Sequence, residues 1–198
     1  MNGRVTVEPL TGPALLAALP DLARLRITVF RDWPYLYDGS LAYEQGYVEK
    51  FAKSPGAVIV AARDGDRIVG AATASPMVGH ADAFAEPFRA RGYDIARICY
   101  FGESVLLSAY RGHGIGHAFF DAREAHARTL PDVTHTVFCG VVRPADHPLR
   151  PADYVPLDAF WMKRGYHKLE GLVGSFAWLD IGETAKTAKP MQFWMKAL

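Results

Sequence analysis

The sequence ESVLLSAYRGHGIGHAFF, residues 103–120, decides the fold. It runs from a strand-like stretch through RGHGIG, residues 111–116, into an amphipathic helix. Glycine at every second position lets the chain turn sharply and expose consecutive backbone N–H groups, and the start of the helix adds its own unpaired N–H groups. The stretch therefore predicts an anion-binding turn that suits a diphosphate.

Two other glycine-rich nucleotide-binding loops do not fit this spacing. A dinucleotide fingerprint needs G-x-G-x-x-G with an acidic residue about 20 positions later, whereas this chain has G-x-G-x-G. A P-loop needs Gly-Lys-Ser/Thr, and neither His113 nor His117 can replace that lysine. The turn is therefore interpreted as neither motif.

Hydrophobic periodicity on both sides of the turn predicts a series of strands and helices. Strands are expected at residues 4–8, 57–62, 67–74, 95–107, 134–142, 174–180 and 192–196, and helices at 15–30, 40–52, 117–130 and 157–164. Strand hairpins beside strand–helix–strand crossovers predict an α+β fold, with a mixed central β-sheet and helices on both faces.

Several local features refine this outline. Within the first helix, Asp21 follows Pro20 and is a point at which the helix can restart. The fourth strand is expected to be interrupted at residues 102–104. Glu124 and Arg128 are four apart on a helix and predict an outward-facing ion pair. Residues 76–94 give no clear pattern and are left unassigned.

Composition limits the class of protein. The chain has 198 residues, with 22 Lys and Arg against 21 Asp and Glu, which is a formal charge of +1. That size predicts one domain over residues 1–198, and the balance of charge argues against nucleic acid as a partner. No apolar run approaches the roughly 20 residues of a membrane helix, and the N-terminal sequence lacks a signal peptide. We therefore expect a cytoplasmic protein with no membrane partner.

The metal-binding residue types are scattered. Two cysteines, Cys99 and Cys139, are too few for a disulfide framework and lack the paired spacing of a metal site. The seven histidines form no H-x-H or H-E-x-x-H group. We expect two core thiols and no metal ion.

Two segments carry a resemblance to a known family. Residues 110–116, YRGHGIG, resemble the R/Q-x-x-G-x-G/A acyl-CoA loop of the GNAT superfamily of N-acyltransferases, and residues 160–166, FWMKRGY, resemble its F-Y-x-K-x-G-F helix end. The predicted order of elements is similar over nearly the whole chain. The resemblance implies the GNAT fold, whose two central strands splay apart, and acetyl-CoA as the co-substrate.

The resemblance also implies where acetyl-CoA binds. It would lie between the strands that hold residues 99–107 and 134–142, with its diphosphate on the N–H groups of the glycine turn. Backbone groups near the end of the first strand would hold the pantetheine and polarise the thioester carbonyl, where a hydrogen-bond donor stabilises the developing oxyanion. The implied contacts are Leu106, Leu107, Arg111, Gly112, His113, Gly114, Ile115 and Gly116.

Acetyl transfer to an amine requires a base, because an alkylammonium must lose a proton before it can attack a thioester. Glu103 is the candidate catalytic residue, since it is the carboxylate on the strand that leads into the turn. The alternative is a solvated glutamate at a strand bulge.

Trp161 stands where the family has a tyrosine that protonates the departing thiolate. Either Tyr154 or Tyr166 replaces that acid, or the thiolate leaves without one.

In this superfamily the acceptor is usually recognised by the link between the first two helices. Here that link is rich in aromatic and acidic residues, which suit a cationic amine through cation–π contacts and ion pairs. The substrate-binding candidates are Tyr35, Tyr37, Asp38, Glu44 and Tyr154. The alternative is that the aromatic residues only cap the core. Residues 143–156 contain RPAD twice and form either a cover for the site or a proline-stiffened surface loop.

The favoured function is an N-acetyltransferase that moves the acetyl group of acetyl-CoA to a primary amine of a small molecule, by direct attack in a ternary complex. Two alternatives stay open. One is a noncatalytic acyl-CoA-binding sensor or scaffold, and the other is a nucleotide-binding protein that uses the same glycine turn. An edge strand at residues 192–196 would allow a homodimer.

Overall fold

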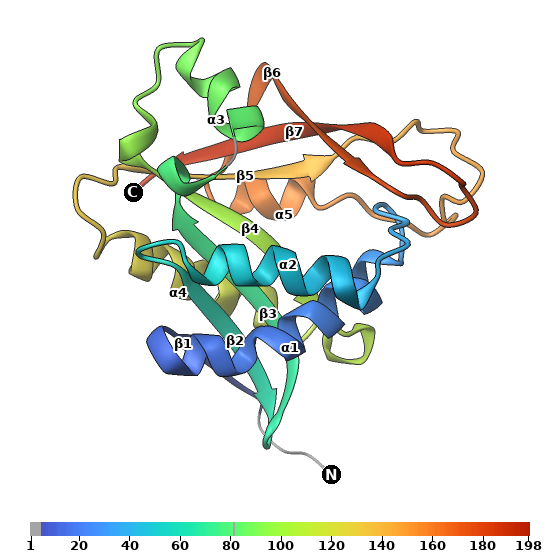
Figure 1. Ribbon diagram of the computed structural model, residues 1–198. Coiled ribbons are helices and arrows are strands. Elements are labelled where there is room, and N and C mark those ends of the chain that lie inside the picture. The colour runs from blue at the N-terminus through green and yellow to red at the C-terminus, as the bar shows by residue number, and fades with distance from the viewer. Residues whose placement is uncertain (1–4, 81) are drawn as a thin grey trace.

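A computed structural model describes residues 5–80 and 82–198, and its centre is a seven-stranded sheet (Figure 1). The strand order is β1-β2-β3-β4-β5-β7-β6. Only β4 and β5 pair in parallel among these neighbours; the other pairs are antiparallel. The strands are β1 (Thr6–Leu10), β2 (Val58–Asp64), β3 (Arg67–Pro76), β4 (Ile98–Leu106), β5 (His135–Val141), β6 (His167–Trp178) and β7 (Thr187–Ala197).

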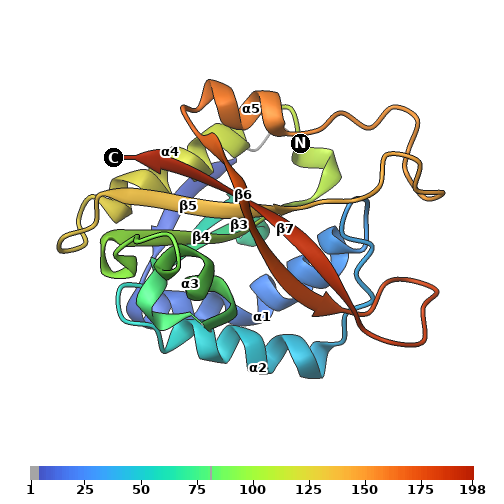
Figure 2. The ribbon, with the colours of Figure 1, turned by 90° about the horizontal axis from the view of Figure 1, so that it is seen from above.

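Helices cover both faces of this sheet (Figure 2). On one face lie α1 (Gly12–Phe30), α2 (Leu41–Ala52) and α3 (Asp82–Arg89), and on the other lie α4 (Ile115–Ala127) and α5 (Asp158–Lys163). Alternate residues of a strand pack against the helices on opposite faces of the sheet. In β2, Ile59 packs with α1, whereas Val58 and Val60 pack with α4. The predicted mixed sheet with helices on both faces is confirmed.

The two central strands separate after a short contact. Pairing of β4 with β5 runs only from Ile98 opposite His135 to Tyr100 opposite Val137. Beyond that point β4 continues to Leu106 and pairs with β3 alone, while β5 continues to Val141 beside β7. The facing edges of both strands are therefore free of a strand partner, which confirms the predicted splay.

A β-bulge in β4 sets which residues face α1 and α2. Ser104 pairs with Ala72 and Phe101 pairs with Ala74, so β4 has one residue more than β3 in this interval. An extra residue reverses the in–out alternation of everything that follows it. Glu103 thereby faces α1 and α2. The interruption predicted at residues 102–104 is wrong: the strand is continuous and bulged.

Gly102 is required by this bulge, because a Cβ at that position would lie 2.5 Å from Thr73 Oγ1. We expect Gly102→Ala to lower the free energy of unfolding by about 1–3 kcal/mol, measured by urea denaturation. Adding Thr73→Ala removes the obstructing hydroxyl and should recover most of the loss. Gly46→Ala, in an exposed turn of α2 where a Cβ meets nothing within 4 Å, is the control and should stabilise slightly. A neutral Gly102→Ala would contradict this account of the bulge.

Other boundaries differ from the predictions. Helix α1 runs through Pro20 without a restart at Asp21. Helix α3 forms inside the unassigned segment 76–94, and β6 begins at His167 and ends at Trp178, where only residues 174–180 were predicted. Arg4, the start of the first predicted strand, lies outside the described residues.

The predicted edge strand at residues 192–196 is wrong. These residues belong to β7, which pairs with β5 on one side and β6 on the other, so the terminal strand of the sheet is β6. Within the described ranges, no helix is both long enough and apolar enough to span a membrane.

Candidate active site

The glycine turn has the geometry of an anion-binding site. Gly112 and Gly114 adopt positive φ angles of 82° and 78°, which favour glycine, and Gly114 is the N-cap of α4. The first hydrogen bond of α4 runs from the amide of Ala118 to the carbonyl of Gly114. The backbone amides that precede Ala118 in the first turn therefore have no acceptor within the helix. A Cβ at either glycine would meet no atom within 4 Å, so the turn is open from outside. These residues fit a diphosphate.

The remaining predicted acyl-CoA contacts surround this turn. Arg111 and His113 are exposed, and Ile115, the first residue of α4, is buried in the core. Arg111 Nε donates to the carbonyl of Leu106 at 3.3 Å. The amide of Leu107 donates to the carbonyl of Val69 at 3.1 Å, so this amide is already engaged with β3. The backbone groups left for a pantetheine are those on the free edges of the splayed strands.

Glu103 lies at the bulge, beneath α1 and α2. Its side chain is only 2% exposed, and Oε2 accepts from Arg26 at 2.6 Å and from the Tyr47 hydroxyl at 3.2 Å. Burial and the charge of Glu103 raise the pKa of the Tyr47 phenol, so the phenol stays protonated and donates. Among the described residues Oε1 of Glu103 has no hydrogen-bond partner, although it is buried. A buried carboxylate oxygen without a partner is costly, so this oxygen is free to accept a hydrogen bond from a ligand.

Arg26 joins Glu103 to a second buried carboxylate. Its Nε donates to Glu44 Oε2 at 2.5 Å, and its guanidinium lies 4.0 Å from the ring centre of Tyr47. Burial lowers the pKa of Arg26, but the charges of Glu103 and Glu44 outweigh it and hold the pKa above its usual range. The other oxygen of Glu44 accepts from the Tyr37 hydroxyl at 2.7 Å. Glu44 is fully buried.

The link between α1 and α2 is fixed to the segment that follows β5 and to the end of β6. Arg143 donates to the carbonyls of Pro34 and Tyr35 and pairs with Asp180 at 2.7 Å. The indole of Trp178 also donates to the carbonyl of Tyr35, at 3.0 Å. The ring of Tyr35 lies 4.4 Å from that of Phe30 and 5.9 Å from that of Trp178 (centre to centre). This predicted substrate residue therefore lies in an aromatic wall with fixed backbone positions.

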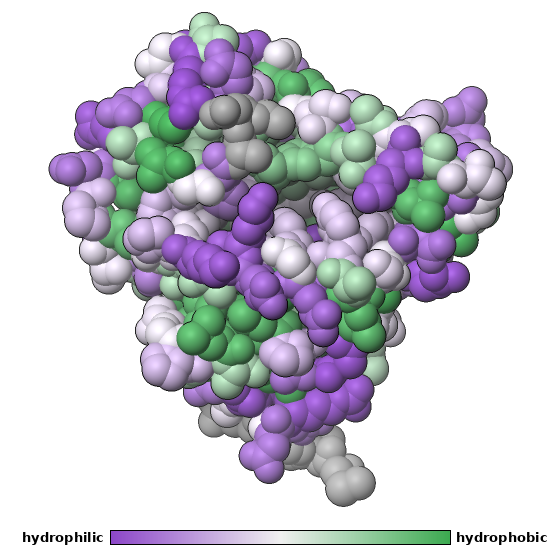
Figure 3. Space-filling view, viewed as in Figure 1, coloured by the Kyte–Doolittle hydropathy of each residue, from purple (hydrophilic) through white to green (hydrophobic). Residues whose placement is uncertain are grey.

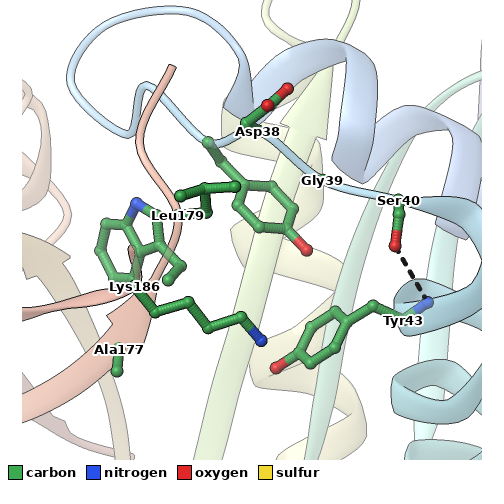
Figure 4. Close-up of a pocket in the computed structure, with 9 residues that line it drawn as sticks. Asp38, Gly39, Ser40, Tyr43, Ala177, Leu179 and Lys186 are labelled. Carbon is green, nitrogen blue, oxygen red and sulfur yellow. Dashed lines mark hydrogen bonds between the residues drawn. The ribbon is translucent and has the colours of Figure 1, made fainter. Parts of the chain in front are cut away.

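A pocket of about 320 Å³ opens between this link and the β6–β7 connection (Figure 4). It is lined by Tyr37, Asp38, Gly39, Ser40, Tyr43, Ala177, Trp178, Leu179 and Lys186. The Lys186 ammonium points at the ring of Tyr43, 4.7 Å from its centre. Asp38 is exposed and pairs with Arg31 at 3.1 Å. Two predicted substrate residues, Tyr37 and Asp38, thus belong to this pocket.

Tyr154, in the loop of residues 143–156, is half-buried against Trp33, with ring centres 5.8 Å apart. His147 contacts the same indole at 5.1 Å. The loop thus packs on the α1–α2 link. On this face of the molecule a hollow opens between α2 and the strands β6 and β7 (Figure 3).

Trp161 and Tyr166, which were considered in relation to protonation of the departing CoA thiolate, lie in different environments. Trp161 packs against Phe138 and lies over Gly140 of β5, where a Cβ would come within 3.0 Å of its ring. Tyr166 is buried; its hydroxyl donates to Glu124 at 3.2 Å and lies 2.9 Å from the Thr136 hydroxyl. Burial raises the pKa of both cysteine thiols, Cys99 and Cys139, to about 12, which leaves them protonated.

Two arginines of the site were not predicted from the sequence: Arg123, which is buried, and Arg26, whose side chain is 12% exposed. Arg26 follows the buried Leu22 by four residues, and Arg123 follows the buried Phe119 by four, so both fall on core-facing helix positions. Arg123 donates to the carbonyls of Thr73 and Glu103, 3.4 and 3.5 Å away, and thus binds the bulge from the opposite face. A charged residue at a core position of a helix is the signal that identifies them.

The predicted outward pair of Glu124 and Arg128 is wrong. Glu124 is 5% exposed and pairs with Lys196 of β7 at 2.8 Å and with Arg164 at 3.3 Å. Its partners come from segments that follow it by dozens of residues, so a local spacing rule could not identify them.

The chain is similar to known acetyltransferases in sequence and in fold. Residues 22–151 match the model of the acetyltransferase (GNAT) family. No curated protein matches the sequence. One similar solved structure is a ribosomal-protein-alanine N-acetyltransferase from Brucella melitensis, with 16% identity over 98% of this chain and 99% of that one and a TM-score of 0.58. Another is NAA60 from Arabidopsis thaliana in complex with acetyl-CoA, with 14% identity over 98% of each chain and a TM-score of 0.60. A third is the aminoglycoside acetyltransferase AAC(6')-Ib in complex with coenzyme A, with 16% identity over 98% of this chain and 94% of that one and a TM-score of 0.59. At these identities the likeness shows a shared fold.

Proposed function

Because the chain belongs to the GNAT family of acetyltransferases, we propose that it transfers the acetyl group of acetyl-CoA to a primary amine of a small molecule, by direct attack of the amine in a ternary complex. The observation that carries this proposal is the buried carboxylate of Glu103, whose free oxygen lies at the bulge beside the opening between β4 and β5. A base at that place can serve an acceptor that enters from the α1–α2 face.

The glycine turn supports acetyl-CoA as the donor. Its open amides and two positive-φ glycines suit the diphosphate, and the free edges of β4 and β5 offer unpaired backbone groups to the amides of a pantetheine arm. When bound there, the co-substrate supplies an activated acetyl carbonyl. The Arabidopsis thaliana NAA60 structure, which shares this fold, was solved in complex with acetyl-CoA, and this supports acetyl-CoA as the donor.

The chemistry balances with the residues present. Glu103 accepts one proton from the acceptor ammonium, and the nitrogen then forms a bond to the acetyl carbon. The carbon–sulfur bond breaks with its electron pair on sulfur, and the nitrogen loses its second proton, which passes through solvent to the departing thiolate to give the CoA thiol. A thiol has a pKa of about 8.5, so the thiolate is a good leaving group without a dedicated acid. This fits a site in which Trp161 replaces tyrosine and the Tyr166 hydroxyl is held by Glu124.

A small acceptor is favoured over a basic protein tail. The formal charge of +1 gives the chain no acidic excess to attract such a tail. One similar structure is an aminoglycoside acetyltransferase, and another is a ribosomal-protein-alanine N-acetyltransferase, so the fold serves acceptors of both sizes. The single domain, the cytoplasmic location and a homodimer stay predictions.

The test is CoA release from acetyl-CoA with a panel of acceptors, combined with mass spectrometry of the products. The panel contains propylamine, benzylamine, 1,4-diaminobutane and a peptide with an N-terminal alanine. Steady release with an acetylated small amine supports the proposal. Acetylation of the peptide alone would move the acceptor to protein termini. Tight acetyl-CoA binding with no turnover on any acceptor would identify a noncatalytic sensor or scaffold.

A further inference from the structure

We propose that Glu44 sets the charge preference of the acceptor site: by holding one edge of Arg26, it leaves the buried cluster with one negative charge in excess, which selects an acceptor that arrives as an ammonium ion. The inference builds on the function proposed above and assigns Glu44 to positioning and charge selection. Direct contact with the substrate falls to Glu103.

The geometry separates the roles of the two carboxylates. Arg26 uses Nε for Glu44 and Nη1 for Glu103, at 2.5 and 2.6 Å. Both oxygens of Glu44 are engaged, one by Arg26 and one by the Tyr37 hydroxyl. Glu103 keeps one oxygen without a partner among the described residues. Only Glu103 can therefore receive a ligand, while Glu44 can act only through Arg26.

The charges of the cluster do not cancel. Arg26 carries one positive charge, and Glu44 and Glu103 carry two negative ones, all with side chains no more than 12% exposed. Without Glu44, Arg26 would neutralise Glu103 completely. With Glu44 present, the guanidinium is shared, and the site keeps a net negative charge in a poorly solvated place. Burying an uncompensated charge is unfavourable, and an incoming cation relieves that cost.

The other groups near Glu103 on the α1–α2 face carry no charge, so the excess negative charge of the cluster remains on that face. Tyr47 and Tyr35 lie close to its carboxylate, and burial raises the pKa of both phenols, so they stay neutral. Tyr100, whose pKa burial also raises, lies against Cys139 on the same face. Arg123 is a buried cation on the opposite face; its charge interacts with Glu124 as well as with Glu103, and its guanidinium donates to backbone carbonyls of the bulge. Aromatic rings and one excess negative charge together suit an ammonium ion.

The experiment compares ammonium ions with alcohols of the same shape. Binding of propylamine against 1-propanol, and of benzylamine against benzyl alcohol, is measured by calorimetry with CoA bound, so that no acetyl transfer occurs. In the wild-type protein we expect at least one ammonium to bind about tenfold or more tightly than its alcohol. Glu44→Gln keeps the volume and the acceptor for Arg26 but removes the charge, and it should lower this ratio about tenfold while alcohol binding is unchanged.

Two further variants make the result specific. Glu44→Asp restores the charge and should restore the ratio. Glu8→Gln is the matched control, because Glu8 also pairs with an arginine, Arg63, but is 48% exposed and far along the sheet on β1.

Two results would overturn the inference. One is a wild-type protein that binds neither ammonium better than its alcohol. The other is a Glu44→Gln variant that weakens ammonium and alcohol equally, which is the signature of a purely structural residue. The readout is binding, so a protein that prefers ammonium ions but acetylates none of them would contradict the proposed function and leave this inference standing.

Discussion

Replacing Glu103 by Gln is expected to lower kcat/KM for an alkylamine acceptor by about 10²- to 10⁴-fold, the usual contribution of a positioned general base. Glutamine has the same shape and can still accept from Arg26 and Tyr47, so the buried cluster should persist. The amide cannot take a proton from the acceptor ammonium. The measurement is the initial rate of CoA release over a range of amine concentrations.

The control for Glu103→Gln is an acceptor that needs no base. Aniline is uncharged at neutral pH, so its slower reaction should be affected much less by the substitution than that of benzylamine. Acetyl-CoA binding should also be unchanged, because Glu103 faces α1 and α2 rather than the glycine turn. Equal losses on both amines, or full activity with benzylamine, would remove Glu103 from the role of base and favour the alternative of a structural glutamate at the bulge.

Replacing Gly114 by Trp is expected to abolish acetyl-CoA binding. Gly114 has φ 78°, and the space around it is open because it faces the proposed diphosphate site. At roughly a thousandfold excess of ligand over Kd, binding adds on the order of 4 kcal/mol of stability. Thermal unfolding of the wild-type protein with acetyl-CoA should show a clear rise in Tm that is absent in the variant.

Gly92 provides a matched control for the loop substitution. It has the same φ of 78° and the same lack of atoms within 4 Å of a Cβ, but it follows α3. Gly92→Trp should carry the same backbone strain and keep the acetyl-CoA response. A response retained in Gly114→Trp would show that acetyl-CoA binds elsewhere. Stabilisation by ATP but not by acetyl-CoA would favour the nucleotide-binding alternative.

The features that could be predicted from the sequence are those that depend on a local residue pattern, namely most helices and strands and the glycine turn. Alternating and helical periodicities located most elements, and the glycine turn after a strand identified the family and, through it, the splay of β4 from β5. Glu103 was chosen as the candidate base because it is the carboxylate before the turn, and its role stays a prediction. The β-bulge turns the Glu103 side chain toward α1 and α2, and it depends on the register between β3 and β4. A single sequence does not reveal that register.

Long-range partners account for what the sequence did not predict. Glu44 was expected to contact the substrate because it follows an aromatic link, but Arg26 from α1 reaches it across the helix pair and buries it. Glu124 was expected to face outward, and it became a core residue because Arg164 and Lys196 pack against it. Helix α3 contains Pro87, which disfavours a helix interior and weakens the local signal, and its packing on β6 stabilises it.

The most direct test of direct acetyl transfer is a single-turnover reaction with isotopically labelled acetyl-CoA and excess protein, followed by intact-mass spectrometry of both protein and amine. The account predicts that the label appears on benzylamine or another primary amine of the panel, and that the protein mass stays unlabelled before and after the amine is added. Label on the protein before addition of the amine, or an amine that never acquires it while acetyl-CoA remains bound, would contradict the account.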